Sequence, residues 1–453
     1  NAQELLSTNE VHVSQDPIEW STARKVAILS LVIFANFNES LGSSIITPAV
    51  PQIVHEFHGT NPSIASFLIS IHVIGFAIGP LILSPLGEVY GRSPLMHGSN
   101  ILFVISSILS AVSPNMGLLL FSRVLTGLAA CVPNILGAGY VADLIPVEKR
   151  GRIFALLSFG TLLGSTLGPV IGGYLTLSAG WRWLFWTETI VSGTTAFAAI
   201  FALKETFAPV IRSRAASKES MNQPDAKTTV REAIVRIIKF MIRSPIIVLA
   251  TIQISISYVY FYFLTTSFPI VFGDQYGFNA GQLGLVFIGP AVGTCVGLII
   301  SGPFSDWYLN LQRKQSGRSI PEDRLITSFA GNIVIAAGFF WYGWSAQFHL
   351  HWMMPLAGAS ISSVGCAVAF IAIQTYLTDS FGIYAPSAIA VNTVVRSILA
   401  AVLPLITPSL YHRLGFGWGN SLLGCVALAF SPTTLILSRY GARLRTNPKF
   451  QVI

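Results

Sequence analysis

Long apolar stretches alternate with short polar segments along nearly the whole chain of 453 residues. A membrane-spanning helix needs about 20 consecutive apolar residues, and the stretches have about that length. Six of them precede a polar, basic segment, at residues 26–48, 64–84, 96–113, 117–141, 152–177 and 183–203. Six more follow it, at residues 246–272, 282–304, 325–345, 352–377, 386–410 and 418–439. The pattern predicts an all-α membrane protein with twelve transmembrane helices in two six-helix bundles.

The polar segments divide this predicted architecture into five parts. They are an N-terminal tail at 1–25, a first bundle at 26–203, a central loop at 204–244, a second bundle at 245–440 and a C-terminal tail at 441–453. In the central loop, residues 228–240 alternate apolar and basic positions at helical spacing. This pattern predicts an amphipathic helix that lies on the membrane surface.

The composition strengthens the membrane assignment. Only 10% of the residues are charged and 52% are hydrophobic, whereas a soluble domain has about 25% charged residues. The four cysteines all fall in apolar stretches, at Cys131, Cys295, Cys366 and Cys425. Because they lack loop partners, we interpret them as packing residues and not as a disulfide framework.

The basic residues predict the orientation in the membrane. If the N-terminal tail is cytosolic, 23 of the 27 Lys and Arg residues fall in cytosolic segments and two, Arg182 and Arg413, in outer loops. The remaining two, Arg123 and Arg396, lie inside spans. By the positive-inside rule both termini are cytosolic. The net charge of +8 is therefore attributed to membrane orientation and not to nucleic-acid binding, and we expect a plasma-membrane location.

Two short motifs recur in the two halves of the chain. Residues 84–90, Ser-Pro-Leu-Gly-Glu-Val-Tyr, correspond to residues 302–308, Gly-Pro-Phe-Ser-Asp-Trp-Tyr. Residues 139–143, Gly-Tyr-Val-Ala-Asp, correspond to residues 375–379, Thr-Tyr-Leu-Thr-Asp. Both pairs occur in the same order, which indicates a duplicated half and a pseudo-twofold arrangement of the bundles.

Charged residues inside predicted spans are candidates for function, because a charge in hydrocarbon usually faces a cavity or a partner. Glu39 shares one helix face with Asn36 and Ser43 and is a candidate proton carrier. A structural carboxylate with a permanent basic partner is the alternative. His72 is a further candidate for proton transfer, or else a hydrogen-bonding cavity wall.

Two arginines also lie inside spans. Arginine does not lose its proton, so we expect Arg123 and Arg396 to have conformational or coupling roles more than direct contact with a substrate. Glu188 lies near the outer end of the sixth stretch, where we expect a solvated carboxylate.

Aromatic residues cluster in the seventh stretch. Tyr258, Tyr260 and Tyr262 lie too deep for an interfacial belt, so they are expected to line an apolar pocket for a bulky organic molecule, with ordinary packing as the alternative. The other expected cavity residues are polar and come from several spans: Asn36, Ser43, Asn134, Gln253, Ser257, Gln374 and Asn392.

Glycine recurs at every fourth position in the fifth stretch, at Gly160, Gly164, Gly168 and Gly172, with Pro169 and Gly173 beside it. A stripe of small residues lets two membrane helices approach closely. Proline permits a bend. We expect this stripe to be a close-packed sliding surface on which the two halves rock.

The chain carries no enzyme signature. It has neither a GxSxG nor an HExxH motif, no CxxC, and no P-loop. We therefore expect a protein that is not an enzyme, needs no cofactor and draws its energy from an ion gradient.

Several of these motifs resemble the major facilitator superfamily, and within it the twelve-span drug:proton antiporters of fungi. Residues 84–93 resemble the loop motif after the second span, although Ser93 stands where the family usually has a basic residue. Arg123-Val124-Leu125-Thr126-Gly127 is similar to the R-x-x-x-G motif of the fourth span, whose arginine is implicated in proton coupling. Residues 164–173 match the antiporter motif G-x-x-x-G-P-x-x-G-G at every fixed position.

The resemblance implies a monomeric transporter that alternates access around a midplane cavity. It implies a cytosolic gate with these members: Glu88, Gly91, Arg92, Asp143, Arg150, Asp306 and Asp379. The expected function is export of a small, largely apolar organic compound, such as an antifungal drug or a secondary metabolite, in exchange for protons. An organic-anion or polyamine carrier is the rival within transport. A membrane-bound enzyme or a transporter-like sensor is the rival outside it.

Overall fold

The computed structural model describes residues 17–58, 62–146, 150–207, 210–211, 244–316, 321–381 and 385–446, with isolated positions between 231 and 239. Within these ranges every regular element is helical. The expected amphipathic helix at 228–240 lies mostly outside the described residues. So do the tails at 1–16 and 447–453.

The N-terminal half contains α2 (Thr22–Ser44), α3 (Val50–Glu56), α4 (Pro62–Ser70), α5 (His72–Tyr90), α6 (Arg92–Ala111), α7 (Met116–Leu144), α8 (Arg150–Ala179) and α9 (Arg182–Ala202). The C-terminal half contains α12 (Pro245–Phe268), α13 (Ala280–Val286), α14 (Ile288–Ser316), α15 (Leu325–Gln347), α16 (Met353–Phe381), α17 (Ala385–Val402) and α18 (Thr407–Thr446). Short turns join several of them, including η4 (Pro269–Gln275) after α12 and η7 (Leu403–Ile406) between α17 and α18.

The expected count of twelve membrane crossings is confirmed. Eleven helical segments are long and apolar enough to span a membrane, but one of them, Ala388–Gly441, has 54 residues. At 1.5 Å per residue such a helix would be about 80 Å long, more than twice the thickness of a hydrocarbon core. The segment is interrupted by η7 and by Gly415, whose φ is +72°. It therefore crosses twice.

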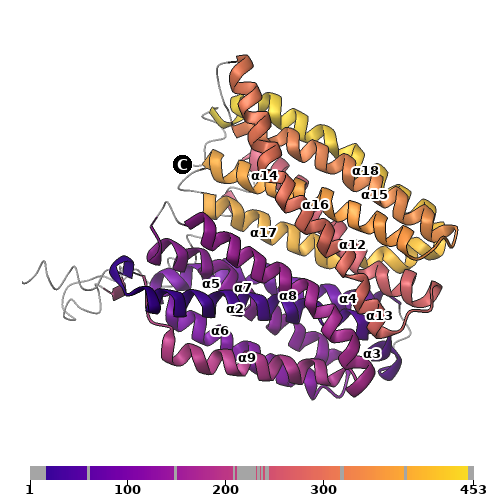
Figure 1. Cartoon of the computed structure of the whole chain (residues 1–453), viewed down its shortest axis with the longest axis horizontal. Helices are drawn as coiled ribbons and strands as arrows, with labels where there is room; N and C mark the ends of the chain where they lie inside the picture. Colours follow the sequence, from indigo (N-terminus) through magenta and orange to yellow (C-terminus); the bar gives the residue numbers. More distant parts are fainter. Residues whose placement is uncertain are drawn as a thin grey trace, which may run out of the picture.

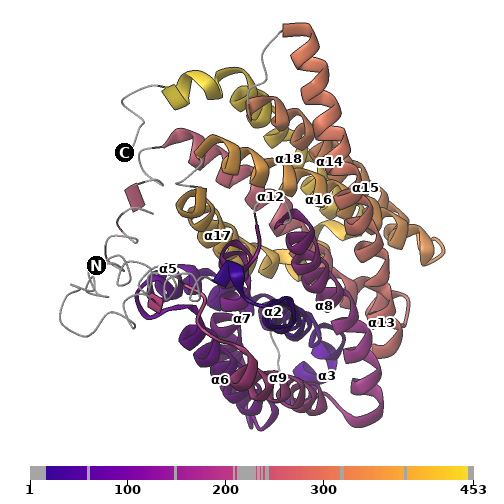
Figure 2. The ribbon, with the colours of Figure 1, turned by 60° about the vertical axis from the view of Figure 1, so that its left-hand side comes forward.

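The two halves form separate helical layers, one above the other in Figure 1. The same packing recurs in both: α6 packs on α7 and α9 as α15 packs on α16 and α18, and α5 packs on α7 as α14 packs on α16. This repetition agrees with the duplicated half expected from the sequence. The start of α2 and the end of α18 lie at one end of the bundles in Figures 1 and 2, which we call the terminal face; the opposite end is the far face.

The glycine stripe of α8 packs mainly within the N-terminal half. A Cβ atom added at Gly164 would lie 2.2 Å from the carbonyl oxygen of Phe37, and one at Gly172 would lie 2.1 Å from that of Ile45. Both carbonyls belong to the chain that forms α2 and its continuation, so the stripe joins two helices of one half. The expected sliding surface between halves is thus only partly correct.

The contact between halves is made by the next residues of the motif. A Cβ atom at Gly173 would lie 2.3 Å from the carbonyl oxygen of Ala280, and one at Gly284 would lie 2.3 Å from that of Pro169. At the same end, Ser70 Oγ donates to the carbonyl oxygen of Ala401 at 2.8 Å. These contacts hold the halves together at the far face. The C-terminal end of α14, by contrast, stands away from the N-terminal half in Figure 2.

Candidate substrate cavity and coupling residues

A cavity of about 230 Å³ lies between the two halves and is lined by both. The N-terminal half contributes mostly polar and titratable side chains: Asn36, Glu39, Ser40, Ser43, Ser44, Thr47, His72, Asn134, Thr161 and Ser165. The C-terminal half contributes mostly aromatic ones: Tyr258, Phe261, Tyr262, Thr265 and Phe287. The cavity therefore has one polar wall and one aromatic wall.

Helical spacing explains how the walls are built. On α2, the residues from Asn36 through Glu39 and Ser43 to Thr47 recur every three or four positions, which places them on one face. On α12, Tyr258, Tyr262 and Thr265 do the same. Each wall is thus mainly one face of one helix, widened by neighbouring helices.

Glu39 lies in the polar wall and is 7% exposed. It forms no ion pair or hydrogen bond with any residue that the structure describes, so the alternative of a permanently paired structural carboxylate finds no partner there. His72 is 3% exposed and lines the same cavity. Two groups able to exchange protons thus share one wall.

Arg123 lies behind this wall and is fully buried. Its Nη1 donates to the carbonyl oxygen of Gly42 at 2.8 Å and its Nη2 to that of Ser43 at 3.0 Å. Both carbonyls belong to the helical turn that follows Glu39. Arg123 therefore links α7 directly to the segment of α2 that carries the cavity carboxylate.

Glu188 is the second carboxylate of this region, and the expectation that it is solvated is wrong. It is 1% exposed and accepts a hydrogen bond from Ser107 Oγ at 3.3 Å. It also attracts Arg123 electrostatically. Because α9 faces α6 at this point, the side chain points into the bundle and not to the membrane surface.

Arg396 lies on α17 of the opposite half. Its guanidinium carbon lies 4.6 Å from the ring centroid of Tyr258 and 5.1 Å from that of Phe370. Tyr258 lines the cavity, so Arg396 sits directly behind the aromatic wall.

Two α12 residues that were expected in the cavity, Tyr260 and Gln253, lie outside its lining because their side chains leave the helix in another direction. Tyr260 Oη donates to the carbonyl oxygen of Leu423 and its ring meets Phe339 edge-on at 4.9 Å. Gln253 Oε1 accepts from Thr433 Oγ1 at 3.0 Å. At 100° per residue, both residues lie on the side of α12 opposite Tyr258.

The other expected cavity residues divide as follows. Ser257 is buried on α12 away from the cavity lining. Gln374 of α16 and Asn392 of α17 are also outside the lining. Asn36, Ser43, Asn134, Tyr258 and Tyr262 do line the cavity.

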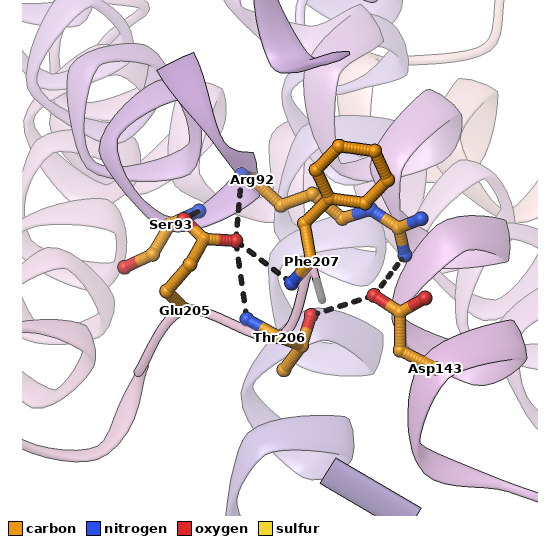
Figure 3. A network of polar contacts seen from close by, with 6 residues as sticks. All are labelled: Arg92, Ser93, Asp143, Glu205, Thr206 and Phe207. Carbon is orange, nitrogen blue, oxygen red and sulfur yellow. Dashed lines mark hydrogen bonds and ion pairs between the residues drawn. The ribbon is translucent and has the colours of Figure 1, made fainter. Parts of the chain in front are cut away.

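At the terminal face, a polar network ties together the start of α6, the end of α7 and the segment after α9 (Figure 3). We call it the latch; it consists of Arg92, Ser93, Asp143, Glu205, Thr206 and Phe207. Arg92 Nη1 and Asp143 Oδ2 form an ion pair at 2.7 Å, and Thr206 Oγ1 donates to the same carboxylate oxygen at 3.0 Å.

Glu205 is the hub of the latch, and no sequence pattern pointed to it. Its Oε1 accepts from the backbone N–H groups of Arg92, Thr206 and Phe207 at 3.0–3.1 Å, and its Oε2 accepts from that of Ser93 at 3.2 Å. The first two residues of α6 thus receive their N-terminal cap from a carboxylate more than 100 residues away. A negative charge is favourable there, because the helix dipole is positive at its N-terminus.

Gly91 lies against the latch, and no side chain would fit at this position. This residue has φ of +99°, and a Cβ atom there would lie 2.2 Å from Glu205 Oε2. Of the expected gate, Gly91, Arg92 and Asp143 therefore belong to one network. The side chains of Glu88, Arg150, Asp306 and Asp379 lie outside the described part of the chain.

A second cavity, of about 480 Å³, lies between the halves nearer the far face. Its lining includes Val50, Pro51, Ile270, Asp274, His412 and Phe416. Ile69 lines both cavities. The side chain of Ile69 therefore belongs to the partition that separates them.

Comparison with known proteins agrees with this architecture. The chain is 39% identical to the MFS-type transporter penM of Penicillium rubens over 97% of this chain and 89% of that protein. It is 40% identical to the MFS transporter cpaT of Aspergillus oryzae, over 96% and 90%. It is 36% identical to the efflux pump radE of Floropilus chiversii, over 96% and 84%.

Solved structures share the fold at much lower identity. The xylose transporter XylE of E. coli superposes with a TM-score of 0.69 over 92% of this chain and 98% of that one, at 16% identity. The family profile described as Major Facilitator Superfamily matches residues 32–404. The family expected from the sequence motifs is thereby confirmed: this chain belongs to the Major Facilitator Superfamily.

Proposed function

We propose that the protein exports a small, largely apolar organic compound, such as a fungal secondary metabolite or an antifungal drug, in exchange for protons. The observation that carries the proposal is the cavity between the halves, with titratable groups on one wall and aromatic rings on the other. An aromatic wall suits an apolar cargo. Relatives named as transporters and as an efflux pump support the direction of transport.

Glu39 is the proton carrier in this proposal. A carboxylate that lines a cavity between two moving halves can take up a proton in one conformation and release it when water or cargo changes its surroundings. Arg123 donates hydrogen bonds to two backbone carbonyls in the turn of α2 that follows Glu39. A movement of α7 is therefore transmitted to Glu39, which is how protonation and rocking of the halves become coupled.

The terminal face is the cytosolic one in this proposal, because described basic residues of the expected cytosolic segments, Arg24, Arg92 and Lys204, lie at that end. The contacts at Gly173, Gly284 and Ser70 then close the outer side, and cargo enters from the cytosol. Cargo leaves past Ile69 into the second cavity when the outer contacts separate. The latch keeps the cytosolic ends of α6, α7 and α9 together as the N-terminal half moves.

Uptake into proteoliposomes with an acidic interior tests this proposal. We would use three fluorescent probes of similar shape: neutral naphthalene-2-sulfonamide, anionic naphthalene-2-sulfonate and cationic naphthylmethylammonium. At least one should accumulate in response to the pH gradient. Glu39→Gln and Arg123→Ala should abolish this accumulation while binding persists.

The matched control is Glu56→Gln. Glu56 is a carboxylate at the far face whose partners are Trp181 and Arg182 and not the cavity. This variant should still respond to the gradient. Transport that ignores the gradient in the unmodified protein would contradict proton coupling and indicate a facilitator.

A further inference from the structure

Arg396 is a charged group whose hydrogen-bonding capacity the structure leaves unused. It is partly buried within a membrane-spanning helix, and arginine keeps its charge there. It forms no ion pair or hydrogen bond with any described residue, and its Nε is buried without an acceptor. A charge at this depth usually has a partner. Its guanidinium packs against the rings of Tyr258 and Phe370.

We propose that Arg396 forms an anion-binding subsite beside the central cavity, and that the cargo carries an acidic oxygen group such as a carboxylate, sulfonate or phenolate. This inference rests on the proposed function as a transporter of small organic compounds and specifies the chemical class of the cargo. The acidic group meets Arg396, and the apolar remainder lies against Tyr258, Phe261 and Tyr262.

The geometry of the guanidinium supports this assignment. The guanidinium carries five N–H donors in a planar fork that matches two oxygen atoms of one acid, and none of them donates to a residue that the structure describes. Tyr258 connects the subsite to the cavity, because it lines the cavity and packs on Tyr262 with ring centroids 5.3 Å apart.

Asn392 is an independent indication of a missing ligand. It lies one helical turn from Arg396 on the same face of α17. It is 1% exposed, and neither its Nδ2 nor its Oδ1 has a hydrogen-bonding partner among the described residues. Buried amides are normally satisfied, so the Nδ2 group is a second donor for the same acidic group.

Arg123 does not compete for this role. Both of its terminal nitrogens donate to backbone carbonyls, and it interacts electrostatically with the carboxyl group of Glu188. The guanidinium of Arg396 has no comparable neighbours in the described chain. Of these two buried arginines, only Arg396 offers its charge to a ligand.

Binding of the three naphthalene probes to the purified protein in nanodiscs, measured by titration calorimetry, tests the inference. The unmodified protein should bind the sulfonate at least tenfold more tightly than the sulfonamide. Arg396→Gln should lower sulfonate affinity by about 10- to 100-fold, the usual effect of losing a charged hydrogen bond. Sulfonamide affinity should change less than about threefold, which also reports an intact cavity.

Two further variants sharpen the comparison. Arg396→Lys keeps the charge but loses the planar fork, so it should retain an intermediate preference for the sulfonate. Arg413→Gln removes an exposed arginine outside the cavity and should leave both affinities unchanged.

Equal affinity for sulfonate and sulfonamide in the unmodified protein would overturn the inference, and so would tighter binding of the ammonium probe or no binding of the sulfonate. A preference that survives in Arg396→Gln would also overturn it. If Arg396→Gln does not fold, the unmodified protein and Arg396→Lys decide the question. Gradient-driven uptake of the sulfonamide without any preference for the sulfonate would refute this inference and leave the proposed export function intact.

Discussion

The glycines that join the two halves at the far face allow one sharp test of alternating access. Gly284 lies so close to α8 that a Cβ atom would be 2.3 Å from the carbonyl oxygen of Pro169. Ordinary contact begins at 3.4 Å. Gly284→Ala therefore requires the two halves to separate locally by about 1 Å.

The clash raises the free energy only of conformations in which the far face is closed, because only there does Gly284 contact α8. Overpacking a tight contact costs about 1–3 kcal/mol, and a bias of that size changes a conformational equilibrium by about 5- to 150-fold. Alanine also favours the helix by about 1 kcal/mol relative to glycine, but this gain is the same in both conformations. Gly284→Ala should therefore shift the protein toward conformations in which the far face is open.

Double electron–electron resonance spectroscopy, which measures the distance between spin labels attached at Gln52 and Arg413, detects this shift. Both positions are exposed, one in each half near the far face, and the four native cysteines would first be replaced. The unmodified protein should give a predominantly short distance. Gly284→Ala should add or enlarge a longer one.

Two control variants separate this effect from simple destabilisation. The Cβ atom of Gly193→Ala would have no atom within 4 Å, so this variant should leave the distance distribution unchanged. Gly164→Ala clashes with Phe37 inside one half, so it should lower thermal stability without changing the distance distribution. An unchanged distribution in Gly284→Ala would refute the reasoning that this contact holds the far face closed.

Three further predictions concern other parts of the molecule. Gly91→Ala should lower the unfolding free energy by about 1–3 kcal/mol through strain and a clash with Glu205, measured by thermal unfolding. Glu205→Gln should cost a similar amount, because a charged acceptor is lost from several N–H groups; a loss below about 0.5 kcal/mol on the same measurement would remove Glu205 as the hub of the latch. Glu56→Gln should cost no more than about 1 kcal/mol, since its pair with Arg182 is about 40% exposed; a larger loss in unfolding experiments would show that this pair is structural.

The fold could be predicted from the sequence because a membrane imposes one length and one polarity on each span. The polar wall of the cavity could also be predicted, because its residues on α2 follow a helical spacing. On α2, Asn36, Glu39 and Ser43 recur every three or four positions, so their helical spacing selects one face. Where an apolar background surrounds a few polar residues, periodicity is informative.

The aromatic wall could be predicted only in part. Residues 258–263 contain five aromatic side chains, so the pattern covers every side of α12 and gives no direction. Tyr258 and Tyr262 face the cavity, whereas Tyr260 faces α15 and α18. Glu205 could not be found at all, because its main partners are backbone N–H groups that leave no trace in the sequence.

The division of the cavity into a titratable wall and an aromatic wall has a consequence for how such a protein can diversify. The groups assigned to energy conversion belong to one repeat, and the groups assigned to cargo recognition belong to the other. Substitutions on α12, α13 and α17 can therefore change what is carried while the residues of α2 and α7 that we propose for proton coupling stay as they are. A duplicated ancestor whose halves specialised in this way can acquire new cargoes by altering one half alone.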